Sequence, residues 1–168
     1  GNNLNITYDA SDFDNTIAIS GVGSEINNYL VAKRKVEKEL SKKNKEIYSL
    51  EEDMYLERMM AFKNSQEELL NNSEGLPTEF VAKEKKNLHY AYLSKLNEFE
   101  RAHKYFTKNE DFNVSDDFLK DVKSIDYSNV EDFEFSGNYK GLVSDHYGDK
   151  ANKLSEKDSI AYEMAFIK

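Results

Sequence analysis

The first residues with the makings of a chemical site are Gly21-Val22-Gly23, which lie between a β-branched stretch and the start of a helical pattern. A Gly-x-Gly loop in this setting is half of the fingerprint by which dinucleotide-binding folds approach a pyrophosphate. The third glycine of that fingerprint would stand where this chain has Ile26, and neither a second strand with a ribose-binding acid nor a Gly-Lys-Ser/Thr sequence follows. We therefore expect the glycines only to turn the main chain, and Ser24 to cap the next helix.

Glu100 and His103 have the three-residue spacing with which a helix supplies two ligands to a di-iron site in a bundle. Such a site needs a second pair of this kind, and no acidic residue stands three positions before His89 or His146. His103 also falls on the apolar stripe of its helix. We therefore predict a hydrogen-bonded histidine in the core or at its rim, and no metal site.

Two pairs of adjacent acids, Asp116-Asp117 and Glu131-Asp132, have the residue types of a general acid and base. Neighbouring residues on a helix point about 100° apart, however, and acids at these positions stabilise the start of a helix. The chain has no cysteine, which excludes a thiolate nucleophile, a disulfide and a zinc-thiolate site. We predict no catalytic, cofactor-binding or metal-binding residue.

A short polar stretch of the chain contains more aromatic residues than such a stretch usually requires for its packing. These are Tyr127, Phe133, Phe135 and Tyr139, which we call the aromatic group. Packing beneath loops is the favoured interpretation. The alternative is a face that contacts a partner, either a peptide or a glycan. The absence of tryptophan weighs against a glycan. These four residues are the candidate partner-contact residues of the chain.

Composition limits the classes of protein to which the chain can belong. With 23 basic and 32 acidic residues, its net charge of −9 repels nucleic acid unless a basic patch outweighs the total. The densest basic stretch, 33–45, is interrupted by Glu37 and Glu39 and has no aromatic residue, so we expect it to be a solvated helix face. No apolar run reaches the ~18 residues of a membrane helix. We predict a mainly α protein with neither a nucleic-acid partner nor a membrane-spanning segment.

Residues 1–20 predict a β-hairpin. Residues 4–8 alternate apolar and polar side chains, 9–12 have the composition of a turn, and the returning strand ends in the β-branched stretch 16–19. Two strands alone are marginally stable. The hairpin must therefore pack on helices, pair with another chain, or belong to a larger sheet, and we favour the tail of an upstream β module.

Residues 21–168 predict a helical domain, a bundle or loosely solenoid-like helix pairs. A first helix spans 24–43, a second begins at a capping box formed by Ser49 and Glu52 and ends at 72–75, and a third runs from Pro77 through Phe106. The apolar stripes of these three helices include Ile26, Tyr29, Leu30, Val36, Leu40, Tyr55, Leu56, Met59, Met60, Phe62, Leu69, Leu70, Val81, Leu88, Tyr92, Leu96, Phe99, His103 and Phe106.

Shorter elements follow residue 107. They comprise a helix capped by Ser115, a turn at 126–129, a helical turn near Phe133, a helix at 139–147 and a last helix capped by Ser155. The last helix is expected to bury an apolar stripe, namely Ile160, Ala161, Met164 and Ile167. That stripe has no helix-ending signal, which suggests that the natural chain continues or that the chain was cut at this point.

Several of these segments resemble one family. The matching residues are Ile19-Ser20-Gly21-Val22-Gly23, Asn28-Tyr29-Leu30 with the overlapping Asn27, then Phe80, Leu88, Tyr90, Tyr92, Leu93 and Leu96, and finally Tyr139-Lys140-Gly141-Leu142 with Tyr147. They resemble the region upstream of the thioredoxin domain in bacterial envelope thiol-disulfide oxidoreductases of the TlpA/ResA-like (redoxin, AhpC/TSA) type. The chain has no Cys-x-x-Cys, so none of the family's catalytic residues carries over.

The resemblance implies a non-catalytic accessory region in the periplasm or cell envelope. Its partners would be a thioredoxin-like domain beyond Lys168 and envelope protein substrates, to which it would shape access. The alternative is a stand-alone helical binding module of the envelope that recognises a peptide or glycan through the aromatic group. The two hypotheses differ in whether a redox domain follows this chain.

Overall fold

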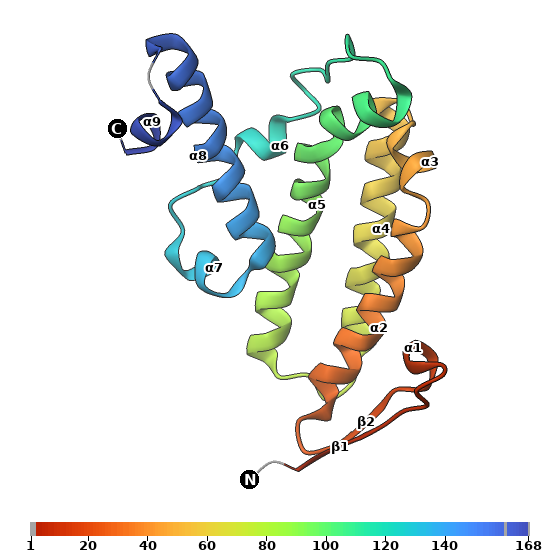
Figure 1. The fold of residues 1–168 in the computed structure, drawn as a ribbon. Helices are drawn as coiled ribbons and strands as arrows, with labels where there is room; N and C mark the ends of the chain where they lie inside the picture. Colours follow the sequence, from red (N-terminus) through yellow and green to blue (C-terminus); the bar gives the residue numbers. More distant parts are fainter. Residues whose placement is uncertain (1–2, 160, 168) are drawn as a thin grey trace.

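The computed structural model describes residues 3–159 and 161–167. The chain is mainly α with an N-terminal two-stranded hairpin, which confirms the predicted fold class (Figure 1). The described part of the chain contains no helix that is long and apolar enough to span a membrane.

Strands β1 (Leu4–Thr7) and β2 (Ala18–Gly21) pair antiparallel, with Ile6 opposite Ile19. The predicted hairpin is confirmed, but its connection includes a helical turn, α1 (Phe13–Thr16). The backbone N–H of Thr16 donates to the Asp12 carbonyl at 3.1 Å and its hydroxyl donates to the same oxygen at 2.7 Å. These bonds stabilise a helical turn where β propensity alone predicts strand.

Helix α2 (Ser24–Ser41) begins after Gly23, whose left-handed backbone (φ 82°) is the turn at its N-terminus. The predicted cap by Ser24 is wrong, because Ser24 is the first residue inside the helix and is buried. The predicted helix 24–43 stops at Ser41, and a separate short helix, α3 (Asn44–Tyr48), follows.

Helix α4 (Glu52–Asn72) begins without a side-chain cap, so the predicted capping box is wrong. The Ser49 hydroxyl donates instead to the Lys45 carbonyl at 2.7 Å, which ties Ser49 to the end of α3. Helix α5 (Thr78–Thr107) follows Pro77, as predicted, and ends at Lys108 in a left-handed conformation (φ 61°).

Beyond α5, the Ser115 hydroxyl accepts from the Phe118 N–H at 3.2 Å in a turn that leads to helix α6 (Lys120–Lys123). Helix α7 (Val130–Phe135) is capped by the side chain of Asn129.

Helix α8 (Gly137–Asp158) is capped by Ser136, whose hydroxyl accepts from the Tyr139 N–H at 3.1 Å. It joins the predicted helix 139–147 to residues that include Ser155, so the cap predicted at Ser155 is wrong.

Helix α9 (Tyr162–Ile167) buries Ala165. Ala161 and Met164, which were expected to be buried, are exposed. Ile160 and the side chain of Ile167 lie outside the described residues.

Helices α4 and α5 run antiparallel, α2 packs on α4, and α8 packs on α5 and diverges from it toward α9 (Figure 1). The arrangement is a bundle. The main core cluster comprises Ile47, Tyr48, Tyr55, Met59, Tyr92, Leu93, Leu96, Phe99, Phe118, Val122 and Leu142. A smaller one contains Tyr29, Leu70 and Leu88.

The helix stripes are largely as predicted. Leu88, Leu96 and Phe99 of α5 are fully buried. Two predicted stripe residues are instead exposed, Leu30 at 43% and Met60 at 41%. Helices α2 and α4 therefore bury a narrower face in the bundle than their sequence patterns predict.

Candidate functional site

The four residues of the predicted aromatic group have different surroundings in the structure. Tyr139 is fully buried, and its hydroxyl donates to the Asp126 carbonyl at 2.6 Å and accepts from the Asn129 N–H at 3.1 Å. It thus holds the loop before α7 onto α8. The prediction that Tyr139 could contact a partner is corrected, because its side chain has no surface in this fold.

The other three aromatic residues contact different neighbours. Tyr127 is partly buried and stacks on His146, with ring centroids 3.8 Å apart and planes inclined by 12°. Phe135 is partly buried, with the Lys83 ammonium 5.9 Å from its ring centroid. Phe133 is 43% exposed and lines a groove.

We define the apolar groove as the depression of about 530 Å³ between α7, α8 and α9. It is lined by Phe133, Lys140, Val143, Ser144, Tyr147, Lys150, Ala151, Leu154, Ala165 and Phe166. Tyr147 and Phe166 are 44% and 57% exposed. Only Phe133 belongs to the predicted group, because the groove is completed by α9, which the sequence pattern did not bring onto α8.

The charged residues that line the apolar groove are both lysines. The Lys140 ammonium lies 5.6 Å from the Phe133 ring centroid, and the Lys150 ammonium lies 5.4 Å from that of Tyr147. Cations over exposed ring faces keep most of their hydration and remain able to meet a carboxylate. On a chain with a net charge of −9, this groove is therefore locally basic.

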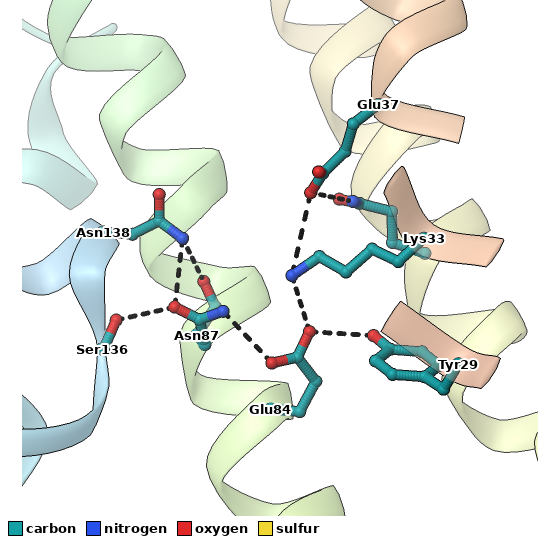
Figure 2. A network of polar contacts seen from close by, with 8 residues as sticks. Tyr29, Lys33, Glu37, Glu84, Asn87, Ser136 and Asn138 are labelled. Atoms are coloured by element: carbon teal, nitrogen blue, oxygen red, sulfur yellow. Dashed lines mark hydrogen bonds and ion pairs between the residues drawn. The ribbon is translucent and has the colours of Figure 1, made fainter. Parts of the chain in front are cut away.

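A second polar arrangement joins α2 to α5 (Figure 2). The Glu84 carboxylate accepts from the Lys33 ammonium at 2.7 Å, from the Tyr29 hydroxyl at 2.9 Å and from the Asn87 amide at 3.1 Å. The side chains of Lys33 and Glu84 are 10% and 8% exposed. Burial, together with the Glu84 charge, raises the pKa of Tyr29, so this phenol stays protonated and donates.

The same network reaches α4 and α8. The Asn87 side-chain oxygen accepts from Ser136 at 2.8 Å and from Asn138 at 3.1 Å (Figure 2). On the opposite side, the Gln66 amide donates to Glu37 at 3.2 Å. We call this set the polar network: Tyr29, Lys33, Glu37, Gln66, Glu84, Asn87, Ser136 and Asn138.

The sequence pattern did not predict this network, because Lys33 was expected on a solvated helix face and Glu84 was given no role. The helical spacing of these two residues could have indicated that they are buried. Lys33 follows the buried Tyr29 by four residues, and Glu84 precedes the buried Leu88 by four, so each lies on its helix's apolar stripe. A charged residue on such a stripe needs a partner of opposite charge when it is buried.

Glu100 and His103 do not converge on a common point. Glu100 pairs with Lys104 at 2.9 Å and accepts from the Val114 N–H at 3.2 Å. His103 is buried and stacks on Phe112 at 3.8 Å, and its Nδ1 has no hydrogen-bond partner within the described structure. The predicted core histidine is confirmed, but ring packing holds it. Among residues 3–159 and 161–167, no group of three or more potential ligands could hold a metal ion.

The acid pairs also differ from one another. Asp116 pairs with Lys123 at 2.7 Å in solvent. Asp132 is 2% exposed and accepts from Lys86 at 2.8 Å and from Tyr90 at 2.6 Å. Asp132 therefore does more than stabilise a helix start, because it also ties α7 to α5.

No family model, curated protein or solved structure matches this chain. The function is therefore argued from the apolar groove and the polar network.

Proposed function

We propose that this chain is a helical binding module whose apolar groove takes an amphipathic, acidic peptide segment of a partner protein. One observation carries the proposal: exposed aromatic residues line a groove between α7, α8 and α9 in which the charged lining residues are both lysines. Apolar patches that remain exposed and are rimmed by charge commonly mark protein interaction sites.

The apolar part of the groove supplies affinity. Phe133, Tyr147 and Phe166 retain 43–57% of their surface in solvent. Covering such rings removes apolar area from water, which favours binding by about 25 cal/mol per Å². The groove runs beside α8, so a partner helix that presents apolar residues at three- and four-residue spacing fits it best.

The lysines supply specificity. Lys140 and Lys150 each lie over an aromatic ring at the groove, and a carboxylate that meets either one adds electrostatic complementarity. A basic partner segment would be repelled here by the lysines, although the chain as a whole would attract it.

Fluorescence anisotropy tests the proposal with two labelled peptides of about twelve residues, each with leucine at the three- and four-residue spacing. One has glutamate at its other positions and the second has lysine there. We expect the glutamate peptide to bind more tightly at low salt. Tighter binding of the lysine peptide, or no binding of either peptide, contradicts the proposal.

Variants locate the binding. Tyr147→Ser and Lys150→Glu should each weaken binding of the glutamate peptide about tenfold or more. Tyr105→Ser, which removes a 66% exposed tyrosine outside the groove, is the matched control and should bind like the parent chain. Equal loss in all three variants would place the binding outside the groove.

A second candidate function remains the accessory region of an envelope thiol-disulfide oxidoreductase. The hairpin favours it, because Leu4 and Ile6 of β1 and Tyr8 just after it are 42–58% exposed. Among the described residues, β1 and β2 pair only with each other. Further strands would cover these side chains. The coding sequence beyond Lys168 tests this candidate: a Cys-x-x-Cys supports it, and a stop codon at that point contradicts it.

A further inference from the structure

A cavity of about 410 Å³ lies between α2, α4 and α5, apart from the apolar groove. Its apolar wall includes Met59 and Phe62 of α4 and Tyr92 of α5. This volume lies within the range of pockets that hold small organic molecules. Part of the polar network also borders the cavity, so its wall carries charged and polar groups beside the apolar ones.

Glu37 brings an incompletely compensated carboxylate to the cavity. Its Oε1 accepts from the Gln66 amide at 3.2 Å and lies 3.8 Å from the Lys33 ammonium. Lys33 is held more closely by Glu84, at 2.7 Å. Gln66 is 2% exposed, so the group that orients Glu37 is itself fixed in the core.

Lys63 brings a cation with unused donors. Its side chain is 19% exposed, and Glu67, at 3.2 Å, is its one ion-pair partner within the described structure. The ammonium also lies 6.0 Å from the Tyr92 ring centroid. An ammonium has three N–H donors, so this one can still donate to a ligand carboxylate.

The other charged lining residues satisfy each other. Lys95 and Glu98 form an ion pair at 2.6 Å. The groups left for a ligand are therefore the Glu37 carboxylate and the Lys63 ammonium. Both line the same cavity, and Lys63 lies one turn from Gln66, which binds Glu37, on the same face of α4.

A ligand that matches this pair must carry an ammonium and a carboxylate close together, with an apolar group beside them. We propose that the cavity binds a free α-amino acid with an apolar side chain. Glu37 accepts from its ammonium, Lys63 donates to its carboxylate, and Met59 and Phe62 contact its side chain.

Isothermal titration calorimetry of the whole chain tests this with L-leucine, isoamylamine and 4-methylpentanoate. The amine lacks the carboxylate and the acid lacks the ammonium. We expect L-leucine to bind, and each analogue to bind about tenfold more weakly or worse. Absence of binding by L-leucine, L-methionine and L-phenylalanine, or equal binding of L-leucine and its two analogues, would overturn the proposal.

Glu37→Gln and Lys63→Gln locate the site, and both should weaken L-leucine binding about tenfold. Glu39→Gln on α2 and Lys85→Gln on α5 change exposed charges on two of the helices that border the cavity, outside its lining, and should leave L-leucine binding unchanged. Circular dichroism of each variant confirms folding. If both cavity variants fold and bind L-leucine like the parent chain, the site assignment is wrong. Tyr147→Ser should retain L-leucine binding, which separates this inference from the peptide groove.

Discussion

At the scale of single residues, Asp132 shows how a carboxylate at a helix start acquires a tertiary role. Its oxygens accept from Lys86, Tyr90 and the Asn129 amide at 2.6–3.0 Å. Burial alone would raise the pKa of Asp132, but the hydrogen bonds from Lys86 and Tyr90 lower it below its ordinary value of 3.8. The charged form is therefore the one that the fold stabilises.

We predict that Asp132→Ala lowers the free energy of unfolding at neutral pH by about 2 kcal/mol, because Lys86, Tyr90 and Asn129 lose a buried acceptor. Since the pKa of Asp132 is lowered in the fold, its contribution is present above pH 3.8 and is lost as the pH falls through that lowered pKa. Urea unfolding at several pH values measures this. Glu131→Ala, at the exposed neighbouring position, is the control. A stability difference that grows as the pH falls would contradict the prediction.

At the scale of elements, the hairpin is joined to the bundle by few interactions. The Asn28 amide donates to the Ile19 carbonyl at 2.9 Å, and Asp14 pairs with Lys38. The end of β2 is constrained further, since Gly21 has φ 105° and a Cβ placed there would lie 2.2 Å from the Asn3 carbonyl oxygen.

Gly21→Ala should therefore open the β1–β2 pairing and leave the helices folded, because the clash involves only hairpin backbone. Amide hydrogen exchange should show faster exchange in 4–7 and 18–21, with protection in α5 unchanged. Gly137→Ala is the matched control, because a Cβ there meets nothing within 4 Å. Unchanged hairpin protection in Gly21→Ala would show that the strands tolerate the side chain.

At the scale of the whole molecule, the polar network connects helices that are far apart in the sequence. Lys33 and Glu84 are separated by 51 residues, and Asn87 and Ser136 by 49. A buried ion pair adds little net stability over apolar residues of similar shape, but removing one partner is costly. The network therefore selects the positions of α2 and α8 against α5.

We predict that Lys33→Met and Glu84→Leu each lower the free energy of unfolding by about 3–5 kcal/mol, because each leaves one buried charge unpaired. The double variant should lose much less than the sum of the two. Chemical denaturation of the parent chain, the two single variants and the double variant measures the interaction between the two charges. Lys83→Met, which breaks the exposed pair with Glu79, should have little effect. Additive losses would mean that the two charges do not interact.

Much of the secondary structure could be predicted locally. The stripe of α5 and the hairpin follow from spacing within a few residues. The errors at Ser24, Ser49 and Ser155 share one cause, because a serine before acidic or apolar residues suits a helix interior or a helix end as well as a cap. The apolar groove was predicted only through Phe133, since its other wall is α9.

The sequence by itself determined that the chain is mainly helical, which side of α5 is apolar, and that no thiol chemistry occurs within it. Local spacing suffices for these properties, because residues three and four apart meet on one helix face. Only the tertiary structure decided that Lys33 is buried, that Tyr139 is a core residue, and that a cavity lies beside Glu37 and Lys63. Those outcomes depend on which helix packs opposite, and periodicity along one chain segment does not encode its partner.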